Sequence, residues 1–80
     1  MPRVILSIPM KDVEPILKGI RWQKMQINDC PYFDISYESK LFWEGYDATI
    51  NEDPIAIKDE WNDEIDIFNG HDIIEENIKI

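Results

Sequence analysis

Residues 5–26, ILSIPMKDVEPILKGIRWQKMQ, decide how we expect this chain to fold, because they read as a strand, a short helix and a second strand. The apolar, β-branched run of residues 4–8 predicts a buried strand. Residues 12–18 predict a helix, and we expect Gly19 to end it in the left-handed conformation. One apolar face of this helix consists of Val13, Ile16, Leu17 and Ile20.

The remaining chain alternates short β-type runs with turns and one further helix. We expect strands over residues 20–27, 32–38, 41–50, 55–57 and 78–80, with a bulge or bend at Gly45. An acidic helix is predicted from Asp59 to about Phe68. The order β-α-β-β-β-β-α-β predicts an α+β fold, a small and partly closed β-barrel with two short helices.

Composition predicts one small, acidic domain. The chain has 80 residues, of which 17 are acidic and 8 basic, and a net charge of −9 that repels nucleic acid and anionic membranes over most of the surface. Cys30 is the only cysteine, which excludes an internal disulfide and favours a reducing cytoplasm. No apolar run has the length of a membrane span, and Pro9 and Lys11 interrupt any signal-peptide core. We therefore expect a cytoplasmic protein that does not bind membranes.

Positive charge gathers at one end of the chain. Residues 1–26 carry five basic and two acidic residues, a net of +3, whereas residues 27–80 have a net of −12. The candidate contacts to RNA or a nucleotide are Lys18, Arg21, Trp22 and Lys24. A guanidinium suits phosphate and an indole can stack on a base. The alternative is that Trp22 lies in the core and the cations pair with the chain's many carboxylates.

Three stretches, in order along the chain, share a pattern with a known domain family. They are Ile5–Ile8 with Val13-Glu14, Ile16-Leu17, Gly19 and Arg21, then Ile35–Ser39, then Phe68–Gly70 with Ile73 and Ile78–Ile80. They resemble the opening strand, helix and G-x-K-x-x-E-x-R motif, the central strand, and the closing helix, glycine turn and strand of the ASCH domains in the PUA-like superfamily. This resemblance implies that residues 1–80 form a single ASCH/PUA-like domain with a role related to RNA or nucleotides.

The sequence departs from the family where catalysis is concerned. Catalytic relatives rely on the Lys/Glu pair of the motif, but Lys24 stands at the glutamate position and Gln26 at the final arginine position. The resemblance therefore implies binding through Arg21 without catalysis. Hydrolysis of RNA or of an acylated nucleoside remains a third hypothesis.

The acidic residues of the C-terminal half suggest a different function. Asp59, Glu60, Asp63 and Glu64 crowd the predicted second helix. Such a face is commonly only solvated. The functional alternative is an inhibitor or nucleic-acid mimic, of the kind that phages encode, which binds a basic protein by electrostatic complementarity.

No other motif carries chemistry. His71 lacks partners at metal-ligand spacing, Cys30 has no triad signature, and there is neither a nucleophile elbow nor a glycine-rich phosphate loop. We therefore predict no catalytic residues, no metal and no cofactor. If neither charged surface matters, the remaining candidate is an exposed aromatic patch that includes Phe42, Trp43 and Tyr46.

Overall fold

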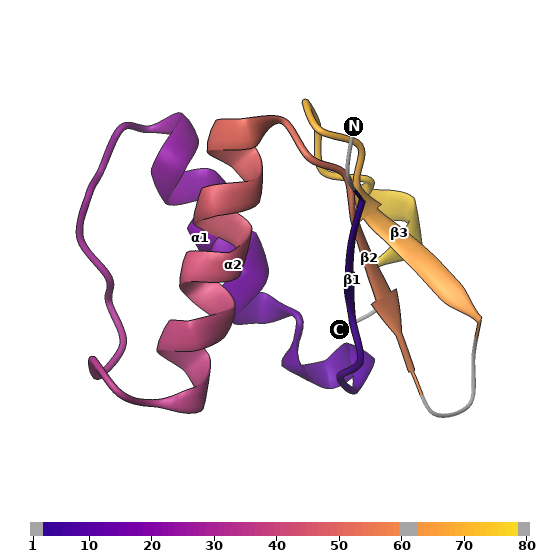
Figure 1. Cartoon of the computed structure of the whole chain (residues 1–80), viewed down its shortest axis with the longest axis horizontal. Helices are drawn as coiled ribbons and strands as arrows, with labels where there is room; N and C mark the ends of the chain where they lie inside the picture. Colours follow the sequence, from indigo (N-terminus) through magenta and orange to yellow (C-terminus); the bar gives the residue numbers. More distant parts are fainter. Residues whose placement is uncertain (1–2, 60–62, 79–80) are drawn as a thin grey trace.

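The computed structural model describes residues 3–59 and 63–78, which form an α+β fold with two layers. Two helices lie on one side of a three-stranded sheet (Figure 1). Along the chain the elements are β1 (Val4–Leu6), the 3₁₀ helix η1 (Met10–Asp12), α1 (Glu14–Lys24), α2 (Tyr37–Asn51), β2 (Ile55–Lys58), β3 (Glu64–Phe68) and the 3₁₀ helix η2 (Glu75–Asn77).

The sheet has the order β1-β2-β3, with β1 parallel and β3 antiparallel to the central β2. Val4 stands opposite Ile55 in the parallel pair of β1 and β2. The crossover that connects these two strands contains both helices, α1 and α2. Ile55, Ala56 and Ile57 are fully buried, as the apolar run of residues 55–57 predicts for a central strand. The predicted strands at 4–8 and 55–57 are therefore confirmed, although β1 ends at Leu6 and its predicted burial is wrong, since Ile5 is 44% exposed.

Two glycines let the helices approach each other closely. A Cβ atom on Gly19 would overlap the carbonyl oxygen of Phe42, and one on Gly45 would overlap the carbonyl oxygen of Ile16. The prediction that Gly19 ends the first helix is wrong, because α1 continues through it to Lys24. Residues 20–27 are consequently not a strand. The left-handed residue after α1 is Gln26, with a φ of 59°.

The predicted strands at 32–38 and 41–50 are also wrong, because α2 occupies Tyr37–Asn51. Its N-cap is Ser36, whose Oγ accepts a hydrogen bond from the Ser39 amide at 3.2 Å. The buried positions Leu41, Gly45 and Ala48 follow the helical spacing i, i+4, i+7. Gly45 thus lies at a helix contact and not at a bulge.

The acidic second helix is not formed either. The segment runs instead from the end of β2 to β3, whose Ile65 and Ile67 alternate with acidic residues as a strand requires. Residues 60–62 of the predicted helix lie outside the described residues.

At the C-terminal end, residues 75–77 form η2 and Ile78 is not in a strand, while residues 79–80 of the predicted last strand are outside the description. Ile73 makes a single bridge to Phe68. Across residues 3–59 and 63–78 the named strands form one open sheet, so a partly closed barrel is not confirmed.

The main core lies between the sheet and the helices. It is built from one face of α1, from α2 and from the inner face of the sheet: Val13, Ile16, Leu17, Ile20, Leu41, Ala48, Ile55, Ile57, Ile67 and Phe68. The predicted apolar face of α1 is therefore confirmed as the face that packs on the core.

Candidate functional site

The four predicted ligand-binding residues of α1 separate into two groups. Arg21 and Lys24 interact with the protein's own carboxylates: Arg21 Nη1 lies 3.9 Å from Glu14 Oε1, and Lys24 Nζ lies 3.8 Å from Asp72 Oδ1. Lys24 also donates a hydrogen bond to the carbonyl oxygen of His71. The C-terminal segment thus supplies a carboxylate and a carbonyl acceptor to Lys24, whereas the carboxylate beside Arg21 comes from α1 itself.

Lys18 and Trp22 form the second group, which contributes to an aromatic cluster. Lys18 Nζ lies 5.3 Å from the centre of the Tyr32 ring, a cation–π distance. Trp22 is half-buried and meets Phe42 edge to face, with ring centroids 6.3 Å apart. The indole therefore packs between α1 and α2 but lies outside the main core, in which the alternative interpretation placed it.

The aromatic cluster is centred on Phe42, which has no exposed surface. Around it lie the rings of Trp22, Tyr32, Trp43 and Tyr46, with centroids 5.0–6.3 Å from the Phe42 centroid. Tyr32 belongs to the connection between the helices, so its contact with Phe42 joins this connection to α2. Phe42 is therefore not part of an exposed aromatic patch, and Trp43 and Tyr46 are only half-buried neighbours of it.

The three acidic candidates among the described residues, Asp59, Asp63 and Glu64, do not share one surface of a helix. Asp59 accepts a hydrogen bond from the Met10 amide at 3.2 Å and so joins the end of β2 to η1. Glu64 pairs with Arg3, which also pairs with Asp66. Asp63 is exposed beside β3, and Glu60 lies outside the described residues.

Arg3 reaches from the start of β1 to β3, because Glu64 and Asp66 belong to the strand on the far side of β2. Its hydrogen bonds to Asp66 and Glu64 raise the pKa of the guanidinium. These interactions lie at the surface and contribute little to stability, but they occupy two carboxylates of the acidic half.

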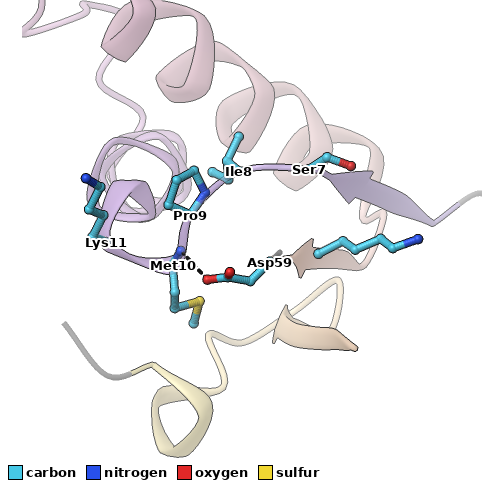
Figure 2. Close-up of a pocket in the computed structure, with 7 residues that line it drawn as sticks. Ser7, Ile8, Pro9, Met10, Lys11 and Asp59 are labelled. Carbon is cyan, nitrogen blue, oxygen red and sulfur yellow. Dashed lines mark hydrogen bonds between the residues drawn. The ribbon is translucent and has the colours of Figure 1, made fainter. Parts of the chain in front are cut away.

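A cleft that the sequence does not indicate lies at the carboxyl ends of the parallel strands β1 and β2 (Figure 2). Its volume is about 530 Å³, and its lining consists of Ser7, Ile8, Pro9, Met10, Lys11, Lys58 and Asp59. Open α/β sheets commonly bind ligands outside the carboxyl ends of their strands. The Asp59 carboxylate points toward the Met10 amide. The Lys11 side chain extends away from both Met10 and Asp59. Only the pairing of β1 with β2 brings these segments together, so local sequence patterns could not reveal the cleft.

A second feature that sequence reasoning missed is an exposed apolar turn before α2, formed by residues 33–36. Phe33 is 77% exposed and Ile35 is 82% exposed, the largest values among the large hydrophobic side chains of the described residues. The sequence predicts a strand over residues 32–38, in which these two side chains would share one face. The helix N-cap at Ser36 was the signal that could have corrected this assignment.

Comparison with protein-family models, with curated proteins and with solved structures finds no match to this chain. In the described part of the chain, no group of three or more histidine, cysteine or acidic side chains is placed to hold a metal ion. None of the described helices combines the length and apolar character needed to cross a membrane.

Proposed function

We propose that this protein is a binding protein that recognises a basic surface on another protein through its excess of negative charge. The observation that carries this proposal is the interaction of Arg21 and Lys24 with Glu14 and Asp72, which offsets the charge of the candidate nucleic-acid contacts. With 17 acidic and 8 basic residues, carboxylates remain in excess even if every cation is paired. A field of this sign accelerates encounter with a basic protein and repels RNA.

The experiment compares RNA with a protein partner. Fluorescence anisotropy with labelled short single-stranded RNAs should show no saturable binding to the wild type at low salt. RNA binding whose salt dependence weakens in the Arg21→Ala/Lys24→Ala variant would overturn the proposal, because it would assign phosphate contacts to those cations.

For the protein partner, the immobilised wild type is used to isolate binding proteins, which are identified and purified. The rate of association with the purified partner should fall about tenfold or more between low and high salt, since screening removes steering. The Glu44→Gln/Asp47→Asn variant, altered at two exposed positions of α2, should associate more slowly at low salt. The Lys11→Gln/Lys58→Gln variant removes two positive charges in place of two negative ones. It is the control and should not slow association. A rate that does not respond to salt or to these charges would contradict the proposal.

A second candidate function is the binding of a phosphate-bearing small molecule, such as a nucleotide, in the cleft at the carboxyl ends of β1 and β2. It is favoured by the position of the cleft and by two exposed lysines in its lining, Lys11 and Lys58; Lys11 extends away in Figure 2, and its flexible side chain has to turn inward to contact a phosphate. This retains the nucleotide-binding role that the ASCH resemblance implies but assigns it to other residues than Arg21.

Calorimetric titration with nucleoside triphosphates, and with inorganic phosphate alone, tests the cleft. Binding should be lost in the Lys11→Ala/Lys58→Ala variant and kept in Lys40→Ala, which removes an exposed lysine of α2 outside the cleft. Equal affinity in all three proteins, or no binding to the wild type, would rule out this function.

A further inference from the structure

The turn of residues 33–36 presents two large apolar side chains to solvent, where they contribute nothing to the packing of the core. Phe33 and Ile35 are 77% and 82% exposed, and Tyr37, which follows at the start of α2, is 48% exposed. Single exposed hydrophobic residues are ordinary, but here three large ones alternate within five residues. In Figure 1 this turn lies at the lower end of the connection of residues 25–36, which runs beside the helices from the end of α1 to the start of α2.

The backbone of the turn is fixed, although its side chains are free of the core. The Ser36 amide and hydroxyl both donate to the carbonyl oxygen of Phe33, at 3.0 and 2.7 Å. Ser39, which is 1% exposed, donates its hydroxyl to the carbonyl oxygen of Asp34 at 2.9 Å. A fixed turn loses less conformational entropy when it binds, so it presents Phe33 and Ile35 as preformed anchors.

The charge around the turn restricts what can cover it. Residues 25–40 contain Asp29, Asp34 and Glu38 against one basic residue, Lys40, which leaves a net charge of −2. A second copy of this chain would bring like charges together on molecules of net charge −9, and RNA and anionic lipid are repelled by the same carboxylates. The occupant that fits both features is a protein with an apolar cleft bordered by lysine or arginine side chains.

We propose that the turn of residues 33–36 is the docking element of this protein, with Phe33 and Ile35 inserting into an apolar cleft on a basic partner protein. This inference rests on the proposed function and adds the site of contact. Asp34 and Glu38 then meet the cationic border of the cleft. Aromatic and aliphatic anchors inside a polar border are the usual arrangement of the residues that dominate binding energy.

The test uses the identified and purified partner and three variants of the full chain. Phe33→Ser/Ile35→Ser should weaken binding by at least about thirtyfold, chiefly through faster dissociation. Ile50→Ser is the matched control, because Ile50 is 54% exposed near the end of α2; it should bind like the wild type. Asp34→Asn/Glu38→Gln should slow association at low salt and affect dissociation less. Circular dichroism and urea unfolding of each variant separate lost binding from lost structure.

The outcomes distinguish the docking element from the proposed function. If the partner binds in a salt-dependent manner but Phe33→Ser/Ile35→Ser binds normally, the docking element is wrong and the proposed function stands. If no basic protein binds, both are wrong. A homodimer of the wild type in sedimentation, lost in Phe33→Ser/Ile35→Ser, would show that a second copy occupies the turn and would overturn the choice of partner.

Discussion

Two neighbouring regions of the molecule differ in the space around their side chains. One is the contact between α1 and α2, which is tightly packed, and the other is the turn of residues 33–36 before α2, which is exposed. At the contact, Gly19 and Gly45 leave no room for a single added carbon, because the backbone of the other helix stands against each of them. At the turn, Phe33 and Ile35 have more than three quarters of their surface in water. Tolerance to substitution in this protein is therefore set by position and not by residue type. Changes at the contact should reduce stability, and changes at the turn should leave it intact.

The largest effect is expected from Gly19→Ala. Alanine is about 1 kcal/mol better than glycine inside a helix, so propensity alone predicts a more stable protein. The new methyl group would overlap the Phe42 carbonyl oxygen, and backbone has to move to make room. We expect a net loss of about 3 kcal/mol in the free energy of unfolding, measured by urea denaturation. Glu44→Ala, at an exposed helical position, is the control and should change stability by no more than about 0.5 kcal/mol. Unchanged or greater stability of Gly19→Ala would show that the helices do not approach this closely.

An intermediate effect is expected from Ser39→Ala, which connects the two regions. The buried Ser39 hydroxyl donates to the carbonyl oxygens of Asp34 and Ser36, so its loss leaves these acceptors without that donor. The free energy of unfolding should fall by about 1–2 kcal/mol. Hydrogen exchange at the Ser36 and Ser39 amides should become faster, because the turn opens more often. Ser7→Ala, which removes an exposed hydroxyl, should leave both measurements unchanged.

A smaller, pH-dependent effect is expected from Tyr37→Phe. Partial burial, and then the negative charge of Asp12, raise the pKa of the Tyr37 phenol, whose oxygen lies 3.4 Å from Asp12 Oδ2. Because the folded-state pKa lies above that of the unfolded chain, this group adds stability below the unfolded pKa, near pH 10. That contribution is lost as the pH rises through the folded-state pKa. The wild type should therefore lose more stability than Tyr37→Phe between pH 9 and the alkaline limit of folding. Parallel curves for the two proteins in urea titrations would show that Tyr37 does not contribute.

The smallest effect on stability is expected from Phe33→Ser/Ile35→Ser. Both side chains are largely exposed, so their replacement should change the free energy of unfolding by no more than about 0.5 kcal/mol. A loss comparable to that of Gly19→Ala would mean that these side chains are buried in solution, which would remove the contrast between the turn and the helix contact.

Secondary structure was predicted correctly where a local apolar run forms a strand. It was predicted wrongly where contacts between distant segments determine whether a segment is a helix or a strand. Residues 4–6 and 55–57 are apolar without interruption, and both runs form strands, although only the central run of residues 55–57 is fully buried. Residues 41–50 contain Phe42, Trp43, Tyr46 and Ile50, which favour strands, yet they form a helix because α1 offers a surface for it. Gly19 was predicted to end a helix and Gly45 to form a bulge or bend. Sequence alone does not distinguish a glycine at a close helix contact from a glycine in a turn.

For the candidate sites, the sequence shows which residues could bind a ligand but not which groups of the protein surround them. A core position of Trp22 was weighed as an alternative, and the structure places the indole half-buried against Phe42, outside the main core. The partners of Arg21 and Lys24 lie at opposite ends of the sequence, on Glu14 and Asp72, so no spacing rule could have identified both. The cleft between β1 and β2 has the same origin, because it exists only once strands 51 residues apart are paired, Val4 beside Ile55.

That parallel pairing also has a consequence for protein synthesis. At about 5–20 residues per second, the ribosome needs about 3–10 s to add the residues between Val4 and its neighbour Ile55. During this time the apolar strand β1 has already been made but cannot join β2, because its neighbour does not yet exist. Residues 4–8 of the nascent chain therefore lack their strand partner over this interval, and we expect chaperones that bind short apolar segments to contact them before β2 has been made.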